Sequence, residues 1–183
     1  MRVLEHYGVM ARYNAWMNAK VYDAAARLTD EARRRDVGAF FGSIHATLNH
    51  LLLTDRAWLA RFTRDASFLV SLDGTTPVFT GRLDQELYAD FATMRAERRK
   101  TDDDIVRWVG TLADDTLATP LSYYSAAYQR KFEHVLWWAV SHFFNHQTHH
   151  RGQVTTLLVQ LGVDPGTTDF LDLLRLGTDT ECA

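Results

Sequence analysis

One segment without proline, residues 133 to 161, constrains the fold of this chain more than any other stretch. Its apolar residues recur at steps of three and four, which is the period of an α-helix that buries one face. Gly162 follows directly and supplies the expected C-terminal stop. The segment also carries a group of closely spaced histidines: His142, His146, His149 and His150. The sequence therefore predicts a long helix whose buried face includes histidine.

His146 and His150 are four residues apart, so they lie one above the other on this helix. At about 100° per residue, the main apolar residues fall within about 40° of His150. These residues are Phe132, Ala139, Phe143, Val154, Leu157 and Leu161. A single buried histidine is usually a hydrogen-bonded core residue, but H-x-x-x-H on a helix is also typical of zinc sites. The position of the pair favours a metal site, with His142 and His149 at its rim.

The composition fits one globular domain spanning residues 1–183, with 46% apolar residues and a net charge of −3. Cys182 is the only cysteine, which excludes an internal disulfide and a cysteine-based zinc site. The N-terminus has no signal-peptide pattern, and no run of about 18 apolar residues occurs. We therefore expect a soluble cytoplasmic protein without a membrane partner. Basic residues 33–35 and 98–100 have acidic neighbours, so we expect solvated ends of helices and no nucleic-acid partner.

Periodicity and breaker residues place the other elements. Long helices are expected over residues 4–28, 40–62, 83–112 and 133–161. Residues 65–82 are expected to form a long loop, and the tyrosine-rich residues 121–132 two short strands or an extended connection. Thr168 can cap a short last helix over residues 169–176. The fold class is therefore all-α: a four-helix bundle with a possible short hairpin before its last long helix.

A third histidine ligand could come from the second helix, where periodicity leaves two candidates. On the helix expected over residues 40–62, the large apolar side chains form one stripe, and small residues occupy the opposite face. His50 lies among the small residues, and His45 also lies away from the large stripe. A face of small side chains admits a neighbouring helix or a ligand, but it can equally be plain surface. The pattern does not choose between the two histidines.

The most specific stretch of the chain is FNHQTHHRGQ at residues 144–153, followed by LGVDPG at residues 161–166. YNAWMN at residues 13–18 and LNHLL at residues 48–52, followed by Asp55 and Trp58, form two further motifs. Together these stretches resemble the DinB family of metal-dependent proteins, in the family's order and over nearly the whole chain. One departure is Ser125-Ala126-Ala127, where relatives tend to have a glycine-containing hairpin.

The resemblance implies a four-helix bundle that holds one divalent metal ion on three histidines, here His50, His146 and His150. It therefore favours His50 over His45. Zinc or nickel is the most plausible ion, and imidazole also suits iron, manganese or copper. Several nearby side chains either orient the imidazoles or are ordinary surface groups. They are Asn49, His142, Asn145, Gln147, His149 and Gln153.

Two functions remain open at this point. Three imidazoles leave metal coordination positions free, which is typical of catalysis, whereas structural zinc usually has four protein ligands. Relatives of the family include transferases and isomerases that use low-molecular-weight thiols. The first hypothesis is therefore a metal-dependent enzyme, such as a thiol-dependent transferase or a hydrolase, acting on a small molecule. The second is a non-catalytic metal-binding protein of the stress response, in which the ion only ties two helices together.

Two further expectations concern the aromatic residues. Tyr124 and Tyr128 either close over the site or pack in the core, and core packing is favoured because amphipathic rings routinely bury their bodies. An aromatic content of 12%, including 5 Trp, exceeds what one bundle core needs. Together with the family resemblance, this favours a homodimer, the commonest oligomer.

Overall fold

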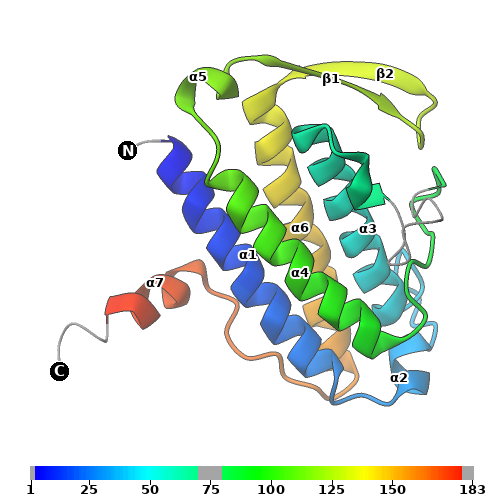
Figure 1. Cartoon of the computed structure of the whole chain (residues 1–183). Helices are drawn as coiled ribbons and strands as arrows, with labels where there is room; N and C mark the ends of the chain where they lie inside the picture. Colours follow the sequence, from blue (N-terminus) through cyan, green and yellow to red (C-terminus); the bar gives the residue numbers. More distant parts are fainter. Residues whose placement is uncertain (1–2, 70–79, 179–183) are drawn as a thin grey trace.

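Four long helices run side by side in the computed structural model, which describes residues 3–69 and 80–178 (Figure 1). They are α1 (Val3–Ala25), α3 (Ile44–Thr63), α4 (Phe91–Val109) and α6 (Leu136–Gln160). α1 and α3 each pack against both α4 and α6. The expected four-helix bundle is confirmed. Within the described residues, no helix combines the length and the apolar character needed to cross a membrane.

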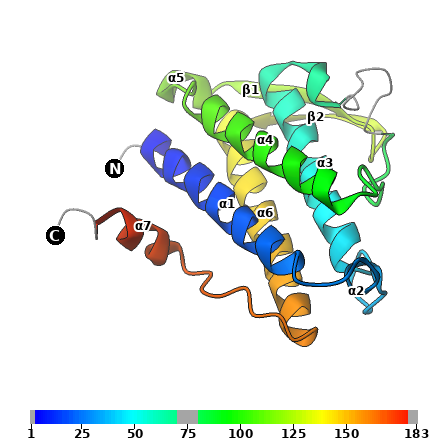
Figure 2. The same cartoon turned by 60° about the horizontal axis from the view of Figure 1, so that its bottom comes forward.

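Shorter elements lie at the two ends of the bundle and beside α1. They are α2 (Asp30–Arg34), the 3-10 helix η1 (Ala66–Leu69), α5 (Asp114–Leu117), β1 (Pro120–Ser125), β2 (Arg130–Val135) and α7 (Phe170–Thr178). The two strands pair antiparallel and form the expected hairpin. In both views the hairpin lies across the end where α6 begins, and α2 lies at the opposite end (Figure 1, Figure 2). The expected loop over residues 65–82 includes residues 70–79, which lie outside the described part of the chain.

The turn of the hairpin contains no glycine. Gln129 instead adopts the left-handed conformation, with φ of 52°. Its side-chain amide donates a hydrogen bond to the carbonyl of Ala126 and its amide oxygen accepts one from the hydroxyl of Tyr124. These bonds within the turn support a backbone conformation that only a minority of residues other than glycine adopt.

The third long helix begins eight residues later than the pattern predicts, at Phe91 instead of residue 83. Asp90 caps it, because its carboxylate accepts a hydrogen bond from the backbone N–H of Thr93 at 2.8 Å. The backbone ahead of the cap is bonded to α3 instead. The side chain of Asn49 accepts bonds from the N–H groups of Leu87 and Tyr88, both at 2.9 Å. Residues 83–89 therefore form an ordered segment along α3 rather than a first helical turn.

α3 is buried on nearly all sides, which its apolar stripe alone did not indicate. Every residue from position 47 to position 60 is buried, including the small residues opposite the stripe. The N-cap is Ser43, whose hydroxyl accepts a bond from the N–H of Ala46 at 3.1 Å. The large stripe faces the bundle, whereas His50 on the small face lies beside α6 and against residues 83–88. The small face is therefore not plain surface.

A layer of buried polar side chains divides the core into two apolar clusters. One cluster lies toward α2 and includes Met17, Leu52, Met94 and Leu158. The other lies toward the hairpin and includes Tyr7, Leu59, Ile105 and Phe143. On α3, α4 and α6 the polar residues fall between the positions that supply the two clusters. The layer consists of Asn14, Asp55, Arg98, Asp102, Gln147 and Arg151.

Arg98 forms the centre of this layer, which corrects the expectation that its basic cluster is solvated. Its guanidinium pairs with Asp55 at 2.5 Å and with Asp102 at 2.8 Å, and only 2% of the residue is exposed. Asn14 and Asn18 donate further bonds to Asp102 at 3.1 and 2.9 Å. A buried charge is tolerable only when it is paired in this way. In the other basic cluster, Arg33 is likewise buried, with bonds to two backbone carbonyls.

Arg98→Met should destabilise the protein by about 3–5 kcal/mol, because it leaves two buried carboxylates without their cation. The exposed neighbour Arg99 is the matched control, and Arg99→Met should change the free energy of unfolding by less than about 0.5 kcal/mol. Urea denaturation at pH 7 measures both values. Equal effects of the two substitutions would show that the buried layer carries no special share of the stability.

Candidate metal centre

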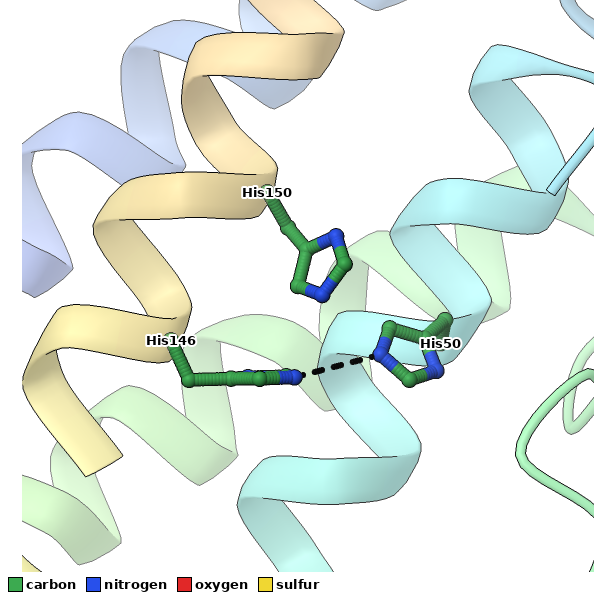
Figure 3. Close-up of side chains that lie close together, drawn as sticks. All are labelled: His50, His146 and His150. Atoms are coloured by element: carbon green, nitrogen blue, oxygen red, sulfur yellow. Dashed lines mark hydrogen bonds between the residues drawn. The ribbon is translucent and has the colours of Figure 1, made fainter. Parts of the chain in front are cut away.

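Three histidine side chains from two helices converge on one point. His50 projects from α3, whereas His146 and His150 project from successive turns of α6 (Figure 3). One ring nitrogen from each lies within 4.8 Å of the others, and the Nε2 atoms of His50 and His146 are 3.3 Å apart. The ring centroid of His150 lies 4.6 Å from that of His50 and 4.4 Å from that of His146. His45 is not part of this group, because its Nε2 lies 2.9 Å from the carboxylate of Glu86.

The orientation of His50 is fixed from two sides. Its Nδ1 lies 2.7 Å from the carbonyl oxygen of Leu83, so Nδ1–H donates and Nε2 keeps a lone pair directed at the cluster. The ring of Phe41 stacks on the imidazole, with centroids 4.0 Å apart. Leu83 belongs to the segment that Asn49 holds against α3. Asn49 therefore acts on the site through this segment and does not touch an imidazole.

His150 is oriented by a side chain one turn further along its own helix. Its Nδ1 lies 2.7 Å from the amide oxygen of Gln153, so this nitrogen carries the proton and its Nε2 is free to coordinate. The amide nitrogen of Gln153 in turn lies 3.3 Å from Nε2 of His149, to which it donates. Gln153 thus connects the buried His150 to the exposed His149. The role of Gln153 as a support for a metal ion stays a prediction.

The donor set fits a divalent metal ion. Two nitrogens bound at about 2.1 Å in tetrahedral geometry lie about 3.4 Å apart, close to the 3.3 Å between His50 and His146. Burial lowers the pKa of His50 to about 4 and that of His146 to about 3, so both imidazoles are neutral at pH 7. Within residues 3–69 and 80–178, no cysteine or carboxylate joins the three histidines. One or more coordination positions would remain for another ligand.

The other expected residues lie around this group in different ways. Gln147 points into the buried polar layer near Asp55 and not toward an imidazole. Asn145 is on the exposed face of α6. His142 lies on the rim, with its ring centroid 5.8 Å from that of His146. The role of each as a support for a metal ion stays a prediction.

A cleft of about 630 Å³ opens onto the cluster and is lined by His50 and His146. α3 supplies its floor through Thr54, Ala57 and Arg61, and the hairpin forms the opposite wall. Tyr128 lines this wall, and Tyr124 and Tyr128 are 55% and 67% exposed. The expectation that they pack in the core is therefore wrong. A two-stranded hairpin has too little apolar surface beneath it to bury both faces.

Phe41, Leu83 and Arg61 are the parts of the site that sequence reasoning missed. The contribution of Leu83 is a backbone carbonyl, which leaves no signature in a sequence. Phe41 precedes α3 and reaches His50 only because of the turn that follows it, where Gly42 has φ of 79°. Arg61 did carry a signal. It follows His50 by eleven residues, or about three helical turns, so it lies on the same face of α3.

Comparisons with known proteins agree with this architecture. The chain is 27% identical to Protein DinB of Bacillus subtilis (strain 168) over 177 residues, which covers 93% of this chain and 94% of the relative. A crystal structure of a DinB-like protein from Bacillus cereus superposes with a TM-score of 0.60 at 21% identity, covering 85% of this chain and 91% of the other. The sequence profile of the DinB family matches residues 2–181. The chain, with its helical bundle and histidine cluster, belongs to the DinB family.

Proposed function

We propose that this protein is a metal-dependent enzyme that activates a thiol, or reacts through a thiol cosubstrate, at His50, His146 and His150. The observation that carries the proposal is the cleft, because two of the three histidines line a space large enough for a small molecule. A purely structural ion needs no such access and usually has a fourth protein ligand. The three described donors leave the cleft side of the site open.

Each residue around the cluster has a definite part in this proposal. His50, His146 and His150 would hold the ion through neutral nitrogens, while the Leu83 carbonyl and Gln153 fix the rings. Phe41 covers one side of His50 and keeps water from it. A bound divalent ion would supply Lewis acidity that lowers the pKa of a thiol or of water into the neutral range.

Family resemblance supports a thiol over water as the group that is activated, and hydrolysis is the alternative within the same site. Zinc or nickel is the ion we propose, since the set is all imidazole. Cys182 lies outside the described residues, and the described lining of the cleft contains no cysteine. The thiol in this proposal is that of a small molecule. A non-catalytic role in the stress response and the expected homodimer both stay predictions.

Purified protein should hold about one divalent ion per chain, and His150→Ala should lose it, because two imidazoles bind far more weakly than three. His149→Ala is the matched control, since this exposed neighbour packs beside the ring of His150 but is not one of the three converging ligands. Elemental analysis of both variants measures the ion content. Unchanged content in His150→Ala would refute the assignment of the ligands.

Zinc binding at pH 6 should release well under one proton. Three histidines with the ordinary pKa of about 6.5 would together release about two protons at this pH, because each must be neutral to coordinate. Burial instead lowers the pKa of His50 to about 4, that of His146 to about 3 and that of His150 below its ordinary value. Since all three pKa values are lowered, the loss of affinity on acidification should lie below the ordinary histidine pKa of about 6.5.

The number of released protons follows from calorimetry in buffers of different ionisation enthalpy. Release of about two protons at pH 6 would show that the imidazoles are solvated in the metal-free protein and that the cluster is not preformed.

Small thiols should alter the absorption spectrum of the cobalt-substituted protein by adding a sulfur-to-metal charge-transfer band. His146→Ala should abolish the band, whereas Gln160→Ala, at an exposed position at the end of α6, should keep it. If no thiol changes the spectrum, the thiol mechanism is wrong and the non-catalytic reading becomes the better one.

A further inference from the structure

Arg61 lies in the cleft at a distance from the histidines. It shares the face of α3 with His50, and Thr54 and Ala57 between them form the cleft floor. Eleven residues of helix span roughly 16 Å, and a long side chain leans back toward the N-terminus of its helix. The guanidinium and the histidine cluster thus mark two regions of one cleft, with small side chains between them.

Two aromatic rings hold the guanidinium of Arg61. Its central carbon lies 4.6 Å from the ring centroid of Trp58 and 4.6 Å from that of Tyr123. Such stacking restrains the planar group while leaving its N–H donors free at the edges. Burial beside these rings also lowers the pKa of Arg61.

No carboxylate of the described residues forms an ion pair with Arg61, although the buried arginines Arg56 and Arg98 both have such partners. The described lining of the cleft contains no aspartate or glutamate at all. Its other ionisable groups are Arg130, Tyr123, Tyr128, His134 and the histidines of α3 and α6. A partly desolvated cation in a cleft without negative charge is an incomplete interaction, because its donors lack an acceptor.

We infer that Arg61 binds a carboxylate of the molecule that reacts at the histidine cluster, so that this molecule is an organic anion with an apolar body. The inference rests on the proposed function for the reacting end and names the substrate class of the same site. The aromatic walls formed by Trp58, Phe132 and Trp138 suit the apolar body. Arg61 would position the anion and, with the metal ion, set the length of molecule that fits.

The test compares the binding of octanoate with that of octanol, which has a similar alkyl chain but no charge. The protein is depleted of metal, so that binding at Arg61 is measured apart from the proposed chemistry at the histidines. Calorimetry should show that octanoate binds about 10- to 100-fold more tightly than octanol, as expected of charge-assisted hydrogen bonds. Arg61→Met should remove this preference and leave octanol binding unchanged. Arg64→Met is the matched control, because Arg64 is exposed at the end of the same helix and is absent from the cleft. Circular dichroism establishes that each variant is folded.

Equal binding of octanoate and octanol to the unmodified protein would overturn the inference, and this comparison holds even if Arg61→Met does not fold. Retention of the preference in a folded Arg61→Met variant would overturn it as well. A second titration, of cobalt-substituted protein with 6-mercaptohexanoate and 6-mercaptohexanol, tests the reacting end. If octanoate is preferred but neither thiol changes the cobalt spectrum, the anion site stands and the thiol function fails. If both thiols change the spectrum but octanoate is not preferred, the function stands and the anion site fails.

Discussion

The buried guanidinium of Arg98, held between the carboxylates of Asp55 and Asp102, is the interaction on which the rest of the bundle depends. An unpaired charge at this depth would cost several kcal/mol, so α3 and α4 can pack only in the register that brings these groups together. Asn14 and Asn18 extend the network to α1 by bonds to Asp102. Apolar packing alone tolerates small shifts between helices, whereas this layer does not.

The same layer explains how the histidines come to lie where they do. On α6, His146 and His150 are each followed by a residue of the polar layer, Gln147 and Arg151. Successive residues differ by about 100° around a helix, so one face of α6 supplies the metal ligands and the adjacent face carries the buried polar residues. Arg151 donates to the side chain of Asn14 on α1. The rotation of α6 about its axis, and hence the aim of both imidazoles, is therefore set by groups that never touch the site.

Much of this arrangement was accessible from periodicity and motif, and the remainder was not, for physical reasons. The four helices follow from their apolar stripes, and the i, i+4 pair on α6 from its place on the buried stripe. The choice of His50 over His45 needed the family resemblance, because both lie off the stripe of α3. The burial of Arg98 escaped prediction, since a charged run looks the same whether its partners are solvent or a carboxylate on another helix. The delayed start of α4 depends on Asn49, which competes for backbone groups across the chain.

The hydrogen bond from His50 reaches a main-chain oxygen rather than a side chain. Every amino acid presents that oxygen, so the support for this imidazole does not depend on which residue occupies position 83. It depends on the path and the number of residues between the end of the preceding loop and the cap at Asp90. The residue type at position 83 can therefore change during divergence, whereas insertions and deletions in this stretch would displace the carbonyl that supports His50. In related sequences we therefore expect the length of this segment to be conserved more strongly than the residue type at position 83.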